Sequence, residues 1–92
     1  MLLNQVIKEV LNASQFLYVK QDKDGLYTIS KQDKNGYMMI DLYTASAINT
    51  VYNAINKRNQ DRLNTMPIIQ AVNLCFKVLK NNGSIFIYGA KP

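Results

Sequence analysis

Apolar residues near the start of the chain recur at the spacing of one helical face. Positions 3, 6, 7, 10 and 11 are apolar, and polar residues fill the positions between them. Because an α-helix has 3.6 residues per turn, side chains three and four positions apart lie on the same face. The pattern predicts an amphipathic helix that ends near Ser14.

Three short runs rich in aromatic and β-branched residues follow this helix: "FLYVK", "LYTIS" and "YMMIDLY". They are separated by two nearly identical pentapeptides, "QDKDG" at 21–25 and "QDKNG" at 32–36. Asp, Lys, Asp or Asn, and Gly in this order suit a type I turn, in which the Gly takes a positive φ and closes a hairpin. We therefore expect a three-stranded antiparallel meander.

Three-residue turns would place apolar side chains on both faces of this sheet. One face would carry Phe16, Tyr18, Thr28, Met38, Ile40 and Leu42, and the other Leu17, Val19, Tyr27, Ile29, Met39 and Tyr43. A sheet with one solvated face alternates apolar and polar residues, so either helices cover both faces or the second face is a contact surface. A shift of one residue in register would regroup these side chains. Tyr27, Met39 and Tyr43 are the expected protein-binding residues.

A second helix is predicted after the sheet, with Thr44 as its N-cap. The small residues at 45–47 allow the close approach of either a phosphate or a neighbouring strand. Lys57 and Arg58 are expected in the last turn, where the helix dipole favours cations. The buried stripe of this helix is expected to consist of Ile48, Val51, Tyr52 and Ile55.

A third helix is predicted to start near Pro67 and to end at the run "NNG" (81–83), in which Gly83 fits the C′ position of a helix cap. Apolar residues cover most of its circumference, so we expect it to be the central helix, with Phe76 in the core. Cys75 lies on the apolar side, which indicates a buried structural thiol rather than a catalytic one. The closing run "SIFIYG" (84–89) is expected to pair with the sheet as a fourth strand.

These elements predict an α+β fold in a single domain (1–92): an N-terminal helix, a three-stranded antiparallel meander, two helices and a short C-terminal strand. Hydrophobic residues make up 48% and charged residues 18%, which is a globular composition. No apolar run approaches the roughly 18 residues that span a bilayer, and the N-terminus lacks a signal-peptide core. A cytoplasmic location without membrane contact is expected, and the single cysteine agrees with a reducing compartment.

The residue types argue against catalysis. The chain has no histidine to act as a base, no cluster of metal ligands, no glycine-rich nucleotide motif, and no nucleophile with a partner. The two pentapeptides have the local order of a calcium loop, but aligning each Gly to position six puts Lys or Leu where carboxylates are required. We therefore expect a non-catalytic protein that binds neither a cofactor nor a metal ion.

Eleven Lys and Arg against six Asp and Glu give the chain a formal charge of +5. Within the segment "NKRNQDRLN" (56–64), Lys57, Arg58 and Arg62 stand among amides, and both residue types contact phosphates and base edges. These three cations are the expected nucleic-acid-binding residues. The alternative is that the segment is an ordinary solvated loop.

From residue 41 to about 80, the runs "DLYTASAINTVYNAI" and "LNTMPIIQAVNLCFKVLK" resemble small accessory proteins of bacteriophages and other mobile genetic elements of Gram-positive bacteria. The resemblance transfers no functional residues. It implies a non-catalytic accessory protein that binds a larger protein of nucleic-acid metabolism, such as a polymerase, primase or helicase, with direct nucleic-acid contact as a further expectation. The alternative function is an inhibitor that blocks a surface of a host defence or replication enzyme.

Overall fold

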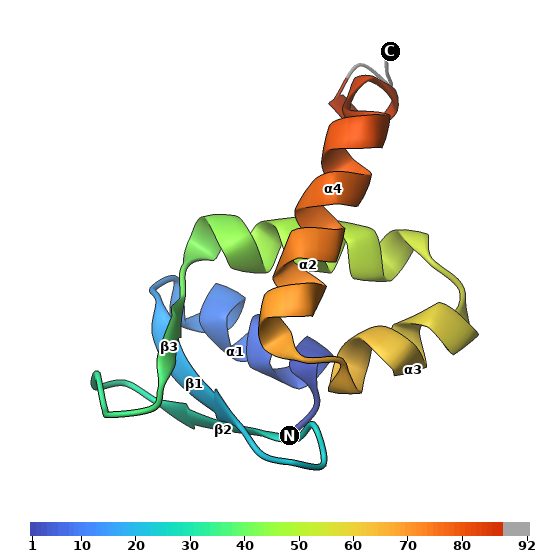
Figure 1. Cartoon of the computed structure of the whole chain (residues 1–92). Coiled ribbons are helices and arrows are strands. Elements are labelled where there is room, and N and C mark those ends of the chain that lie inside the picture. The colour runs from blue at the N-terminus through green and yellow to red at the C-terminus, as the bar shows by residue number, and fades with distance from the viewer. Residues whose placement is uncertain (88–92) are drawn as a thin grey trace.

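Four helices and three strands make up the part of the chain that the computed structural model describes, namely the backbone of residues 1–87 and the side chains of residues 1–80 (Figure 1). The α+β class is confirmed, but three helices follow the sheet instead of two. The order is α1 (Leu3–Ala13), β1 (Leu17–Gln21), β2 (Tyr27–Ser30), β3 (Met38–Ile40), α2 (Leu42–Ala54), α3 (Lys57–Thr65) and α4 (Ile68–Ile87).

Helix α1 forms where the apolar spacing predicts it. It ends at Ser14, which adopts a left-handed backbone with φ of 54°. Its apolar face packs against α2 and against the inner face of the sheet. The side chains on that face are fully buried, and they are Leu3, Val6, Ile7 and Val10.

The hairpin between β1 and β2 also matches the sequence prediction. The N–H of Gly25 donates to the carbonyl of Asp22 at 3.0 Å, and Gly25 has a φ of +85°. The Asp22 carboxylate accepts the backbone N–H groups of Asp24 and Leu26 at 2.8 and 3.0 Å. The aspartate therefore stabilises the turn by satisfying its backbone donors.

The expected three-stranded antiparallel sheet is confirmed, but its meander order is wrong, because the sheet order is β2-β1-β3 and β1 pairs with both other strands. The second pentapeptide does not repeat the first turn. Its hydrogen bond runs from the N–H of Tyr37 to the carbonyl of Lys34, so Gly36 occupies the third turn position. Residues 31–37 span the gap between β2 and β3, which is about two strand spacings, or roughly 10 Å.

The changed strand order shifts β3 by one residue relative to the expected faces. Val19 pairs with Ile29 on one side and with Met38 on the other. The inner face, which the helices cover, carries Leu17, Val19, Tyr27, Ile29, Met38 and Ile40. The outer face carries Tyr18, Lys20, Thr28, Ser30 and Met39, and it is largely exposed. Of the two alternatives, helical cover on both faces is therefore wrong.

The predicted second helix is two helices in the structure. Asp41, not Thr44, is the N-cap of α2, because its carboxylate accepts the backbone N–H of Thr44 at 2.7 Å. Helix α2 ends at Ala54, and Asn56 caps α3 through its side-chain oxygen. Consequently, the segment expected to be a connector at 56–64 is largely helical.

Helix α4 follows Pro67 as predicted, and the residue before this proline, Met66, is extended. Figure 1 shows α4 crossing α2 and extending beyond the rest of the molecule. It continues to Ile87, past the end expected at Gly83. The strand expected over 84–89 is not confirmed, since α4 includes its first part and residues 88–92 lie outside the described residues.

The tip of the β1–β2 hairpin is fastened to the junction between α3 and α4. The Gln21 side chain donates to the carbonyl of Met66 at 2.8 Å and accepts the N–H of Ile68 at 2.9 Å. Gly25 lies so close to Thr65 that a Cβ at this position would stand 2.9 Å from the Thr65 Cβ. These contacts fix the position of the first turn of α4 relative to the sheet.

Candidate functional site

The three cations predicted to bind nucleic acid lie on α3, but they do not form one uniform patch. Lys57 forms an ion pair with Asp61 at 2.7 Å, and hydrogen bonding to Asp61 raises the pKa of the Lys57 amine. Arg58 and Arg62 are exposed one turn apart, so they lie on a common side of the helix. Two of the three cations are therefore available to an anionic partner without breaking this ion pair.

The position of Lys57 and Arg58 in the first turn of α3 removes one structural explanation for them. The dipole of a helix favours cations at its C-terminus and disfavours them at its N-terminus. Because α2 ends before these residues, they stand at the unfavourable end of α3. The expectation that they stabilise a helix end is wrong. Lys57 is paired with Asp61, and the charge of Arg58 is left for solvent or a partner.

The net positive charge of the protein is carried entirely by residues 55–92, which are called its second part. Residues 1–54 contain five lysines and five acidic residues, so this part is neutral. Residues 55–92 carry Asp61 as their single acidic residue, together with Lys57, Arg58, Arg62, Lys77, Lys80 and Lys91. This asymmetry is visible in the sequence and is the signal that points to α3 and α4.

An apolar groove of about 340 Å³ lies between α2, α3 and α4. Val51 and Leu63 are buried at its base, and Leu74 of α4 forms one wall while remaining 41% exposed. Arg62 and Asn59 supply its polar rim from α3. The complete lining is Val51, Ile55, Asn59, Arg62, Leu63, Met66, Leu74 and Val78.

Hydrogen bonds hold the walls of this groove in place. The Gln60 side chain donates to the carbonyl of Tyr52 at 2.8 Å, which joins α3 to the end of α2. Asn64 is buried, donates to the Tyr52 hydroxyl at 3.2 Å and accepts the N–H of Asn4 at 2.9 Å. A groove fixed in this way loses little conformational entropy when a ligand enters.

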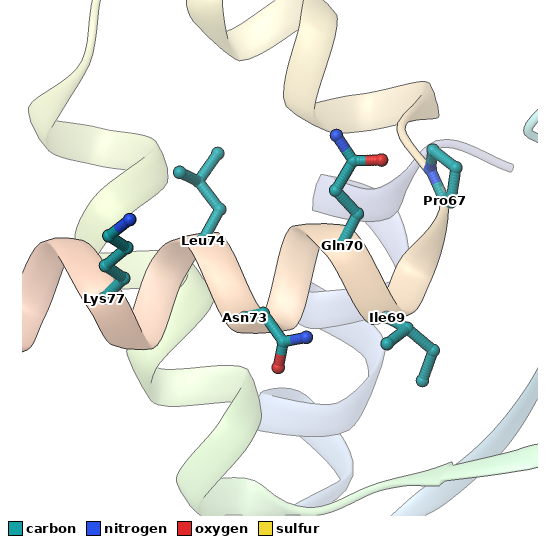
Figure 2. Close-up of a pocket in the computed structure, with 6 residues that line it drawn as sticks. All are labelled: Pro67, Ile69, Gln70, Asn73, Leu74 and Lys77. Atoms are coloured by element: carbon teal, nitrogen blue, oxygen red, sulfur yellow. The ribbon is translucent and has the colours of Figure 1, made fainter.

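The outward side of α4 is more exposed than its sequence suggests. Figure 2 shows Gln70, Leu74 and Lys77 rising from one side of the helix, and Ile69 and Asn73 from the other. Ile69 is 58% exposed, so the expectation that apolar residues bury α4 on most of its circumference is wrong. Together with Pro67, these side chains border a shallow, open depression that shares Leu74 with the groove.

Tyr43, one of the predicted protein-binding residues, forms an aromatic pair on the surface. Its ring stacks on that of Phe76, with 5.6 Å between the ring centroids and 27° between their planes. Tyr43 is 75% exposed, and Phe76 is half-buried. Phe76 therefore supports an exposed tyrosine instead of filling the core as expected.

The other two predicted protein-binding residues lie on opposite faces of the sheet. Met39 is exposed on the outer face opposite Tyr18, whose ring contacts that of Phe16 edge to face at 5.7 Å. Tyr27 is 3% exposed on the inner face, and burial raises the pKa of its hydroxyl to about 12. Met39 and Tyr43 are available to a partner, whereas Tyr27 is part of the core.

Cys75 is buried against the core, in agreement with the prediction of a structural thiol. Burial raises the pKa of this thiol to about 11, which keeps it protonated at neutral pH. Across the described residues, no three His, Cys, Asp or Glu side chains come together as potential metal ligands. In the same part of the chain, no helix has the length and apolar character needed to cross a bilayer.

No family model, no curated protein and no solved structure matches this chain. The candidate functional surfaces of this chain are the groove, the Tyr43–Phe76 pair and the outer sheet face.

Proposed function

We propose that this protein is a non-catalytic accessory protein that binds a larger protein through an aromatic surface centred on Tyr43. The observation that carries this proposal is the exposed Tyr43 ring, which is held in one orientation by its stack on Phe76. Large aromatic side chains dominate the energy of protein interfaces, and those fixed before binding lose less entropy. Met39, four residues before Tyr43, is also exposed, on the outer face of the sheet.

We further propose that the partner belongs to nucleic-acid metabolism, as a polymerase, primase or helicase of a mobile element in the cytoplasm. Two things support this choice: the resemblance of residues 41–80 to phage accessory proteins, and the basic charge of α3 and α4. The exposed Arg58 and Arg62 are residues of the type that contacts the phosphates of nucleic acid. The cationic side of the protein would then bind the partner more tightly when the partner holds nucleic acid than when it is free.

Co-expression with a panel of polymerases, primases and helicases of mobile elements tests this function. We expect affinity purification at low salt to recover a stoichiometric complex with one of them. Tyr43→Ala should abolish recovery, and Tyr43→Phe should retain it because the ring and its stack on Phe76 remain. Assaying the partner with and without the protein separates a helper from an inhibitor. Recovery of none of these proteins, or equal recovery with Tyr43→Ala, would contradict the proposal.

A further inference from the structure

We infer that the groove between α2, α3 and α4 is a second binding site, and that its ligand is an acidic amphipathic helix of a partner protein. This site is separate from the Tyr43 surface. Phe76 and Leu74 are two positions apart on α4, which places them about 160° apart around the helix axis. The inference therefore does not depend on the proposed function.

The lining of the groove selects an aliphatic ligand. Six of its eight residues are aliphatic or methionine, and the other two are Asn59 and Arg62 at the rim. The volume of about 340 Å³ lies within the ~300–1,000 Å³ that is usual for ligand pockets. An amphipathic helix fills such a groove with apolar side chains at i, i+3, i+4 and i+7.

The charges around the groove select an acidic ligand. Arg62 lies at the rim, Arg58 is one turn before it, and Lys77 is one turn beyond Leu74 on α4. The nearby acidic residue on these helices, Asp61, is engaged by Lys57. An acidic helix would meet complementary charge on both sides of its apolar face, which favours its association and its orientation.

Nucleic acid fits the same surface less well. Proteins that bind single strands combine cations with aromatic rings on which the bases stack. None of the eight lining residues is aromatic, and the aromatic rings of Phe16, Tyr18 and Tyr43 belong to other surfaces. Cations alone would bind the phosphate backbone and leave the apolar groove unused.

A second copy of the chain also lacks the required charge. Among the helices of the described residues, α1 contributes only Glu9 and α3 only the paired Asp61, while α2 and α4 contain no acidic residue. No helix in this part of the chain therefore offers an acidic face to the groove of a neighbouring copy.

A display library of amphipathic helices tests this inference without assuming a ligand. Each peptide would carry fixed aliphatic positions at helical spacing, and its polar face would be randomised among Asp, Glu, Lys, Arg and Ser. We expect selection on this protein to enrich acidic peptides. Fluorescence anisotropy of an enriched peptide should show binding that weakens as salt is added, because the steering charges are exposed.

Matched variants locate the binding site. Leu74→Asp should lower the affinity for the peptide by about tenfold or more, and Arg62→Gln should lower it by a few-fold. The controls are Ile69→Asp, an equally polar change on the other side of α4, and Lys8→Gln, an equal loss of charge on α1. Both controls, and Tyr43→Ala, should leave peptide affinity within about twofold. Shifts of the Asn59 and Met66 amide signals in the NMR spectrum of the parent protein locate the site without any substitution.

Several results would overturn the inference. No enrichment, enrichment of basic peptides, or equal losses for Leu74→Asp and Ile69→Asp would exclude an acidic helix in the groove. A labelled single-stranded oligonucleotide that shifts the same amide signals and loses affinity with Leu74→Asp would identify a nucleic-acid site instead. A concentration-dependent dimer that Leu74→Asp disperses would identify a second copy. If Tyr43→Ala abolishes binding of the larger partner but leaves the affinity for the peptide unchanged, the two surfaces are independent.

Discussion

The first 54 residues and the helices that follow them differ in what they contribute to the molecule. Residues 1–54 supply twelve of the fifteen buried hydrophobic side chains, and their charges cancel. Residues 55–80 supply only Leu63, Ala71 and Cys75 to that set, yet the second part of the chain carries the whole net charge. Core formation and the cationic surface are thus separated along the chain.

This difference indicates how α3 and α4 can serve binding without weakening the fold. Their exposed apolar residues, Ile69 and Leu74, lie on a helix whose inner face is already packed through Cys75. Polar contacts of Gln21 and Asn64 then fix the helices relative to the sheet and α1. Substitutions in the first part should therefore affect stability most, and substitutions on the outer side of α4 should affect binding.

The largest expected effect comes from truncating the core in the first part. Ile48 is fully buried on α2, and Ile48→Ala should lower the free energy of unfolding by about 2–5 kcal/mol through lost burial and a cavity. Leu74→Ala, at an exposed position of α4, should cost less than about 1 kcal/mol. Urea denaturation followed by circular dichroism measures both. Equal losses would mean that the groove wall is part of the core.

The two turn glycines compare a turn that contacts the second part of the chain with one whose glycine faces the first part. Gly25 and Gly36 have nearly the same positive φ, +85° and +84°. Alanine should cost about 1–2 kcal/mol at either position for the left-handed backbone. At Gly25 the new methyl group also meets Thr65, while at Gly36 it meets only the flexible Lys20 chain at 3.7 Å or more.

We therefore expect Gly25→Ala to be more destabilising than Gly36→Ala by a further 1 kcal/mol or more, on the order of an overpacked contact. Thermal unfolding of both variants at one protein concentration measures the difference. Equal destabilisation would show that the hairpin does not press on the α3–α4 junction in solution.

The hydrogen bonds of Gln21 are a smaller determinant of how α4 is attached. Gln21→Leu leaves the N–H of Ile68 and the carbonyl of Met66 without this partner, at a cost of about 1–2 kcal/mol. Amide hydrogen exchange should accelerate at Ile68, and the core of α1 should change less. Gln70→Leu on the exposed side of α4 is the control. Uniform acceleration throughout the molecule would mean that α4 and the core unfold together.

Local patterns in the sequence predicted much of the fold. The apolar spacing predicted α1, the pentapeptide at 21–25 predicted the first hairpin, and Pro67 predicted the start of α4. Each of these features is decided by residues close together in the chain. The strand order was not predictable in this way, because the second pentapeptide looks like a hairpin turn while its seven-residue segment carries the chain to the other side of β1.

The candidate site was predicted only in part. Arg62 and Tyr43 were among the predicted binding residues because cations and aromatic rings are recognisable as residue types, and the structure shows both exposed. The groove was missed because it requires the break after Ala54, where Asn56 caps a new helix. Leu74 looked like a core residue because apolar residues surround it in sequence, and only the packing of α4 on α2 decides which of them stay exposed.

The smallest expected effect distinguishes the helix caps of the two parts by their response to pH. Asp41 caps α2 with a carboxylate, and Asn56 caps α3 with a neutral amide. The backbone N–H of Thr44 holds the pKa of Asp41 below its ordinary value of 3.8. Because the folded pKa is lowered, the charged cap stabilises the protein fully above the ordinary pKa. This contribution disappears as the pH falls through the lowered value.

Asp41→Ala should therefore cost about 1 kcal/mol at pH 7, and this cost should shrink as the pH falls below about 4. Asn56→Ala should cost a similar amount at both pH values, because the amide does not titrate. Asp41→Asn keeps the acceptor and should abolish the pH-dependent part. Urea denaturation of the three variants and the parent at pH 7 and pH 3 measures these differences. A cost of Asp41→Ala that is the same at both pH values would show that the carboxylate does not cap α2 in its charged form.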